Sequence, residues 1–185
     1  MGKCDLQIEE KHLYTSDEKL KWWGHGEWVE EPDEVNFFHN GISCRIVRMF
    51  SWDGHNGEHA FGGYLNGYIS IPKDHPCFGK HMDYIPVEGN GGITYSEIDD
   101  QNHPFLPKEG HWIGFDCSHS YDYCPSVEYL KKTQPSLIAI EEEFQQLKNK
   151  LGCENSSIFN KSYKNIAFCI AECKSMADQL LAVRE

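Results

Sequence analysis

The densest group of chemically versatile side chains lies between residues 111 and 124, where an apolar stretch leads into Asp116, Cys117, His119 and Asp122. Loops that follow a buried strand often present functional side chains on a rigid frame, so this stretch is the strongest candidate site. Two catalytic chemistries fit it. Asp116, His119 and Asp122 would bind a metal or a water, or Cys117 would attack as a thiolate with His119 as its base. Taken singly, each residue also has a structural explanation, as a turn cap, a packing residue or a surface histidine.

A second candidate is the turn Asn90-Gly91-Gly92, which is followed by Thr94 and Tyr95. Adjacent glycines permit positive φ angles, and their backbone N–H groups can approach an anion closely. The pattern matches neither the P-loop nor the dinucleotide fingerprint, and it is also typical of an ordinary hairpin turn. The remaining predicted ligand-binding residues are two cations for phosphate groups, Arg45 and Arg48, and aromatic rings. Four rings can stack on a base, namely Tyr95, Trp112, Phe115 and Tyr121.

We expect no bound cofactor. The sequence allows a divalent metal at Asp116 and His119 only as a less favoured alternative. Cys117 and Cys124 lack the short spacing of a structural zinc knuckle, and Cys169 with Cys173 is more typical of core packing. The chain has eight cysteines and no apparent export signal, so we expect reduced thiols rather than disulfides.

The charge balance excludes several classes of partner. The chain has 185 residues. It contains 17 Lys and Arg and 29 Asp and Glu, which gives a net charge of −12. Such a chain is a poor match for nucleic-acid polymers or for anionic membrane surfaces. No apolar run approaches the roughly 20 residues that span a bilayer. We therefore expect a cytoplasmic protein with a single domain over residues 1–185, of which 1–12 are loosely ordered.

The first two thirds of the chain are predicted to form a short helix followed by strands. Thr15 and Glu18 form a capping box, which predicts a helix through residues 19–23 that Gly24 ends. We interpret the acidic run at 30–34 as a solvated turn. Alternating or short apolar patterns predict strands at 42–50, 64–71, 93–95 and 111–117.

The last third changes to a helical period. Apolar residues recur at three- and four-residue steps between residues 137 and 151, namely Leu137, Ile140, Phe144, Leu147 and Leu151. A second helix is predicted over residues 162–183, with one apolar stripe. The pattern predicts an α+β domain: a small, mostly antiparallel sheet, a short N-terminal helix, and two C-terminal helices packed on one face.

Several motifs in order, including Gly-Gly-Ile-Thr-Tyr at 91–95 and Gly-Phe-Asp-Cys-Ser-His at 114–119, resemble a family of small uncharacterised proteins. That family is common in bacteriophage genomes and bacterial chromosomes, and the resemblance covers residues 22–181. The family usually has histidine where this chain has Asn90, and alanine where it has Ser118; Tyr121 precedes Asp122 here. If that histidine is catalytic in relatives, the resemblance implies a chain that binds without turnover.

Three functions remain open. The first is a phage-type accessory protein that binds a small polar ligand, such as a nucleotide-derived defence signal, in the host cytosol. The second is a hydrolase that uses the group at 116–122. The third is an acidic inhibitor of a basic host protein, which the net charge would steer to its partner. Association into a homo-oligomer is compatible with each.

Overall fold

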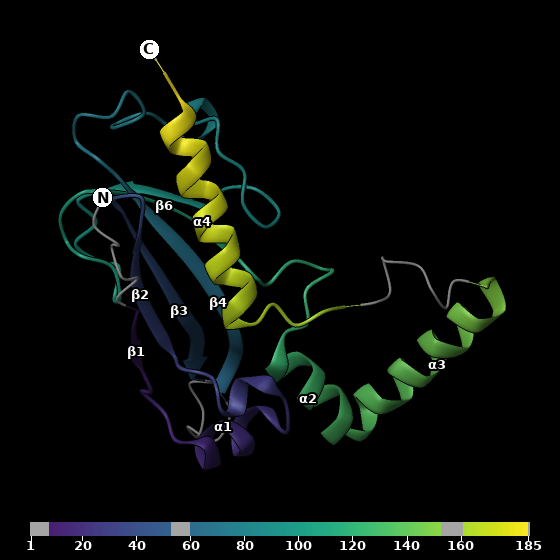
Figure 1. The fold of residues 1–185 in the computed structure, drawn as a ribbon. Coiled ribbons are helices and arrows are strands. Elements are labelled where there is room, and N and C mark those ends of the chain that lie inside the picture. The colour runs from purple at the N-terminus through teal and green to yellow at the C-terminus, as the bar shows by residue number, and fades with distance from the viewer. Residues whose placement is uncertain (1–7, 53–59, 153–160, 185) are drawn as a thin grey trace.

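The computed structural model describes residues 8–52, 60–152 and 161–184. Within them the chain forms the predicted α+β fold, with one antiparallel sheet in the order β1-β2-β3-β4-β6-β5 and helices around it (Figure 1). The strands are β1 (Glu9–Lys11), β2 (Glu34–His39), β3 (Ile42–Trp52), β4 (Ala60–Ile71), β5 (Tyr95–Ile98) and β6 (His111–Asp116). Residues 1–7 lie outside the described part, and Glu9–Lys11, predicted as loosely ordered, pair with β2.

The sheet follows from the alternating sequence. Asn40 and Gly41 adopt positive φ angles of 50° and 86°, the backbone that a tight hairpin between β2 and β3 requires. Alternation along β3 then buries Ile42, Cys44 and Ile46 on one face. The strand β2 was not predicted, because its start belongs to the acidic run that we interpreted as a solvated turn.

The helices are α1 (Ser16–Trp23), α2 (Pro125–Thr133), α3 (Pro135–Leu151) and α4 (Ile166–Ala182), with short 3-10 turns η1 (Glu27–Val29) and η2 (Met82–Tyr84). The capping box of α1 is confirmed, since Thr15 accepts from the backbone of Glu18 and the Glu18 side chain accepts from Thr15. Helix α2 was not predicted from the sequence. None of the described helices is long and apolar enough to cross a membrane.

Helix α4 lies across one face of the sheet and supplies six of the 20 buried residues of the main core (Figure 1). Its predicted apolar stripe is confirmed in part: Ile166, Cys173, Ala177 and Leu180 are buried, whereas Leu181 is exposed, and Cys169 and Met176 complete the buried face. The close approach of α4 depends on Gly67 of β4, where an added Cβ would collide with Cys173 Sγ of α4 as well as with the Phe115 ring. Helix α2 also contacts β4, so C-terminal helices pack against the sheet as expected.

Helix α3 is arranged differently from α4. It contacts α2 and extends away from the sheet (Figure 1). Its predicted periodicity is present, but Ile140, Phe144, Leu147 and Leu151 are exposed to solvent. The pattern therefore identified an amphipathic helix without identifying what its apolar stripe contacts.

A buried ion-pair network joins the N-terminal segment to β3. Arg48 donates from Nε to Asp33 Oδ1 at 2.9 Å and from Nη2 to Glu31 Oε2 at 3.0 Å. Lys19 of α1 lies 2.8 Å from the same Asp33 oxygen, and the Lys19, Asp33 and Arg48 side chains are all fully buried. The interpretation of residues 30–34 as a solvated turn is therefore wrong, since Asp33 is a buried counterion for two cations.

The same network reaches the start of α4. The Tyr163 hydroxyl accepts from Arg48 Nη1 at 2.8 Å and donates to Glu31 Oε2 at 2.7 Å. The other oxygen of Glu31 accepts from the backbone N–H of Ile166 at 3.0 Å. The prediction that Arg48 binds a ligand is corrected here, because its guanidinium is buried and its donors are used inside the protein.

A buried histidine makes stability depend on pH. His111 Nδ1 accepts from the Gly79 backbone N–H at 3.1 Å, so Nε2 carries the proton and donates to Ser96 Oγ at 3.0 Å. Burial lowers the pKa of His111, and Glu97 offsets this only in part. In the unfolded chain, the His111 ring takes up its second proton at about pH 6.5. The contribution of neutral, buried His111 to the free energy of unfolding is therefore fully present above that pH and is lost as the pH falls.

We expect the free energy of unfolding to fall by up to about 1.4 kcal/mol per pH unit below pH 6.5 from this group. Urea titrations between about pH 7 and pH 5 measure the slope. His111→Gln keeps a donor for Ser96 but does not titrate, so its slope should be shallower than that of the wild type. The exposed His12→Gln is the matched control, and equal slopes for all three proteins would contradict the prediction.

Candidate functional site

The loop after β6 is organised around a buried carboxylate. The Asp122 side chain is fully buried, and its Oδ2 accepts from the backbone N–H of His119 at 3.1 Å and lies 2.9 Å from His119 Nδ1. A parallel bridge to Ser162 holds Asp122 against the segment before α4. Two of the predicted site residues, Asp122 and His119, therefore form a direct pair.

Asn90 completes this arrangement from the glycine turn. Its Nδ2 donates to Asp122 Oδ2 at 3.1 Å and to the backbone carbonyl of Asp116 at 3.0 Å. These two bonds use both hydrogens of the Asn90 amide, so Asn90 does not donate to His119 Nδ1. His119 Nδ1 therefore carries the proton that lies between His119 and the Asp122 carboxylate. A neutral His119 then carries its lone pair on Nε2, which is available to accept a proton or a hydrogen bond.

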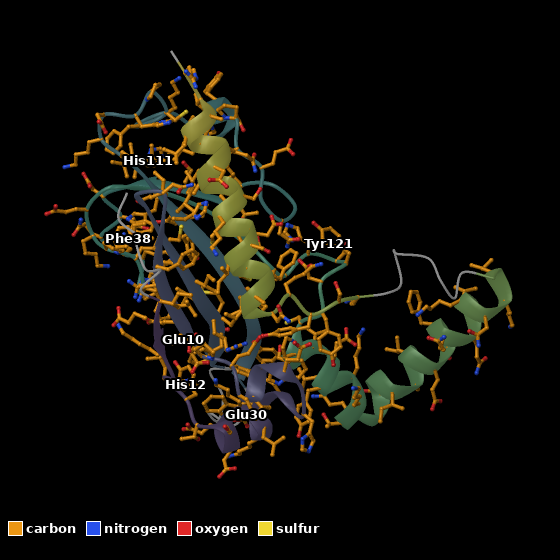
Figure 2. The ribbon with its side chains drawn as sticks, viewed as in Figure 1. Glu10, His12, Glu30, Phe38, His111 and Tyr121 are labelled. Atoms are coloured by element: carbon orange, nitrogen blue, oxygen red, sulfur yellow. The ribbon has the colours of Figure 1, made fainter. Side chains whose placement is uncertain are left out.

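The free edge of His119 faces Gly91 and Tyr121. Gly91 has a φ of +71°, and an added Cβ would collide with both His119 Nε2 and the Tyr121 hydroxyl. The His119 and Tyr121 rings are stacked, with centroids 5.1 Å apart and planes 2° apart. Tyr121 projects from the loop that follows β6 and is 40% exposed (Figure 2). The His119 ring and the Tyr121 hydroxyl therefore pack so closely against residue 91 that a side chain there would displace them.

Asp116 lies at the rim of this group. It follows the buried Phe115 in β6 and so points to the opposite face of the sheet, where Ser118 donates to its Oδ1 from N at 2.9 Å and from Oγ at 3.0 Å. Burial alone would raise the pKa of Asp116, but hydrogen bonds from Ser118 and Thr94 lower it below its usual value. His119 Nδ1 is 3.8 Å from the same oxygen. Asp116 is therefore an anion beside the His119–Asp122 pair.

Cys117 does not have the properties of a nucleophile. It points into the core, 2% exposed, with its Sγ 3.8 Å from Cys169 Sγ. The contact with Cys169, together with burial, raises the pKa of the Cys117 thiol far above its usual value. Since only the thiolate attacks readily, the hypothesis of Cys117 catalysis with His119 as base is corrected.

The other predicted ligand-binding residues do not gather at the glycine turn. Arg45 is in an ion pair with Glu34 of β2 at 2.9 Å, so among the described contacts neither predicted arginine meets Gly91 or Gly92. Trp112 is buried, and the Tyr95 hydroxyl donates to Asp100 at 2.9 Å. Of the four aromatic candidates for stacking, Tyr121 is the one with a ring open to solvent.

Sequence reasoning missed two residues around the site, Tyr64 and Lys164. Tyr64 hydrogen-bonds the Ser118 side chain, so it lies on the Asp116 side. Lys164 Nζ is 3.9 Å from Asp122 Oδ1, a buried oxygen with no hydrogen-bond partner among the described residues. The motif Tyr163-Lys164-Asn165 was visible in the sequence, but nothing local connects it to residue 122.

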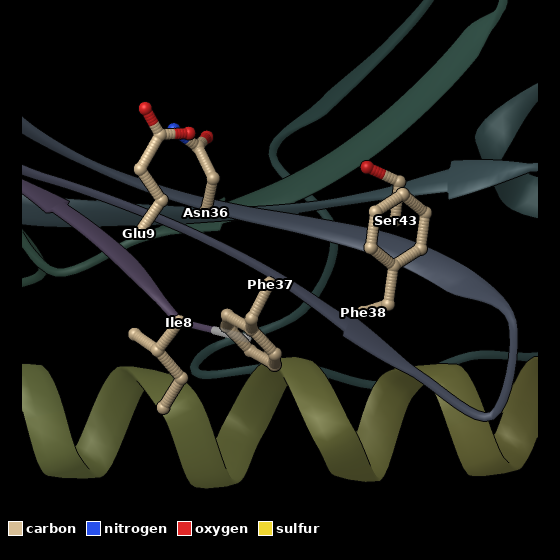
Figure 3. A pocket seen from close by; sticks show the side chains of 6 residues that line it. All are labelled: Ile8, Glu9, Asn36, Phe37, Phe38 and Ser43. Carbon is tan, nitrogen blue, oxygen red and sulfur yellow. The ribbon is translucent and has the colours of Figure 1, made fainter. Parts of the chain in front are cut away.

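The described residues contain no metal-binding group, and a separate cavity lies away from the site. Among the described residues, no three His, Cys, Asp or Glu side chains are arranged to hold a metal ion. A cavity of about 540 Å³ lies at the far edge of the sheet, against β1 and β2. There Phe37 points toward α4 and Phe38 lies on the other side of its strand (Figure 3). That cavity contains none of the predicted site residues.

Together these features define an α+β protein with a buried aspartate that orients a histidine beside a glycine turn. Comparison with known proteins found no matching protein family, no matching curated protein and no matching solved structure.

Proposed function

We propose that this protein binds a small polar ligand at the site formed by Asn90, Gly91, His119, Tyr121 and Asp122. The observation that supports it is the convergence of His119 Nε2 and the Tyr121 hydroxyl beside Gly91, with His119 held by the buried Asp122. Fixing a polar group in advance lowers the entropy cost of binding. The ligand would donate a hydrogen bond to Nε2 and place a planar ring on the exposed face of Tyr121.

The electrostatics narrow the class of ligand. Among the described residues, the printed ion pairs give Asp116 and Asp122 one lysine, Lys164, and the two predicted arginines are paired elsewhere. A ligand that presents several phosphates to this site would meet net negative charge. We therefore propose recognition through the base and ribose of a nucleotide-derived ligand, in keeping with the resemblance to phage-borne proteins and a role against a host defence signal.

Calorimetric titration with a panel of such compounds tests the proposal. The panel includes adenosine, NAD, ADP-ribose and cyclic dinucleotides. We expect at least one to bind, and to bind at least tenfold more weakly to Gly91→Ala, whose Cβ would displace the His119 ring and the Tyr121 hydroxyl. Gly79→Ala, at a turn where a Cβ meets nothing within 4 Å, is the matched control for a positive-φ glycine. Absence of heat with every compound would refute this ligand class.

A second candidate function is hydrolysis. It is favoured by the 2.9 Å contact between His119 Nδ1 and Asp122, which leaves Nε2 placed to take a proton from water. Incubating the bound compound with the wild type and with His119→Asn, followed by chromatography, separates the two functions. Product from the wild type alone supports hydrolysis. Recovery of unchanged ligand from both contradicts hydrolysis and leaves the binding proposal standing.

A further inference from the structure

Helix α3 presents a coiled-coil seam to solvent. Ile140, Phe144, Leu147 and Leu151 follow steps of four, three and four residues, which is the spacing of alternating a and d positions. Their exposed fractions are 61%, 44%, 50% and 63%. A monomer that exposes such a stripe leaves a large apolar surface in water, and stripes of this kind mark contacts with another helix.

The charges beside the stripe identify what the other helix is. Taking Phe144 as position a places Glu143 at g, Lys148 at e and Lys150 at the next g. Acidic side chains therefore flank the first half of the seam, and basic side chains flank the second half. A helix with this asymmetry is complementary to itself when reversed, because g positions face g positions in an antiparallel pair and Glu143 then meets Lys150 of a second copy.

We propose that two copies of this chain associate through α3 as an antiparallel, two-stranded coiled coil. Ile140 packs on Leu151 of the second copy, and Phe144 packs on Leu147. The contact is isologous, so it closes into a dimer rather than growing into a fibre. In a parallel pair Lys150 would face a position beyond the end of α3. Fewer of the charged residues beside the seam would then meet an opposite charge on the other helix.

The size of the contact sets its expected strength. Seventeen residues make a helix about 25 Å long, and one such helix per chain buries less than the roughly 1,200 Å² of a stable standard interface. We therefore expect a concentration-dependent dimer with a dissociation constant on the order of 0.1 mM. The dimer is independent of the proposed ligand site, since α3 contributes no residue to it.

Sedimentation equilibrium of the full chain between about 10 µM and 1 mM tests the dimer. The average mass should rise toward that of two chains, and Leu147→Glu should weaken dimerisation at least tenfold by placing a charge in the seam. Gln146→Glu is the matched control, because it adds the same charge to the same helix outside the seam. A wild type that stays monomeric throughout overturns the proposal, as does a dimer that Leu147→Glu leaves intact.

A charge swap tests the orientation. Lys150→Glu places two like charges against Glu143 of the other copy and should weaken the antiparallel dimer severalfold. Glu143→Lys combined with Lys150→Glu reverses both partners and should restore it. Circular dichroism checks that each variant keeps its helix content. If Lys150→Glu has no effect, or if the double variant fails to restore association, the antiparallel arrangement is overturned.

Discussion

Replacing Arg48 by methionine is expected to lower the free energy of unfolding by about 3–5 kcal/mol, the typical cost of removing one partner from a buried ion pair. Methionine fills a similar volume but supplies no donors. Asp33 would keep only Lys19 as a cation, and Glu31 would lose its 3.0 Å contact with the guanidinium. Both carboxylates would remain inside the protein with part of their charge uncompensated.

The loss should extend beyond the immediate contacts. Glu31 holds the backbone N–H of Ile166 at the start of α4, and Tyr163 bonds to both Glu31 and Arg48. We therefore expect faster amide hydrogen exchange in the first turn of α4 in the variant, in addition to a lower urea midpoint. The network thus fixes the helix that covers the sheet.

Arg45→Met is the matched control for this prediction. It makes the same chemical change on the same strand, but the Arg45–Glu34 pair is partly exposed, with side-chain exposures of 19% and 9%. Its loss should cost less than the loss of Arg48, because Glu34 keeps a second cation, Lys11, with Nζ at 3.9 Å. Equal losses for the two variants, or no loss for Arg48→Met, would show that the buried network does not hold the fold in the way described.

Asp122→Asn is expected to weaken binding of the site's ligand by about 10- to 100-fold, the usual cost of changing a residue that orients a functional histidine. The substitution keeps the shape of the side chain and removes its charge. Asp122 Oδ2 accepts from His119 and from Asn90, and a neutral amide oxygen accepts these hydrogens more weakly. His119 would then be held less firmly in the orientation that directs Nε2 toward Gly91.

Two measurements separate positioning from general damage. Calorimetry with the ligand identified by the panel gives the change in affinity, and ¹⁵N chemical shifts of the His119 ring report which nitrogen carries the proton. We expect a mixed population of tautomers in the variant and mainly the Nδ1–H form in neutral wild type. Unchanged ring shifts would contradict the positioning role of Asp122.

Asp178→Asn is a matched control because Asp178 also contacts a histidine. Its Oδ1 lies 2.8 Å from His39 Nε2, but the side chain is 57% exposed and lies on α4, outside the proposed site. This variant should bind the ligand as the wild type does. A similar loss of affinity in both variants would attribute the effect to overall charge rather than to His119.

The candidate site was found from the sequence only in part. The stretch at 116–122 was identified because chemically versatile side chains directly follow an apolar strand. Asn90 and Gly91 were identified as a turn, and the structure brings that turn to His119. Arg45 and Arg48 were assigned to the same site because they are cations, whereas their carboxylate partners Glu34 and Asp33 decide where they lie.

Local physics determined what the sequence alone could specify. A capping box, a turn with two positive φ angles, two-residue alternation and helical periodicity each depend on residues a few positions apart, so α1, the β2–β3 turn, β4 and α4 were anticipated.

Tertiary structure decided which partner each polar or apolar group meets. Arg48 joins Glu31 and Tyr163, which is 115 residues away along the chain, and Asp122 holds His119 against the turn at Gly91. The apolar stripe of α3 faces solvent while that of α4 faces the sheet, although the two helices have the same period. Such outcomes depend on which distant segments pack together and on which charges can be neutralised away from water. No pattern of neighbouring residues contains that information.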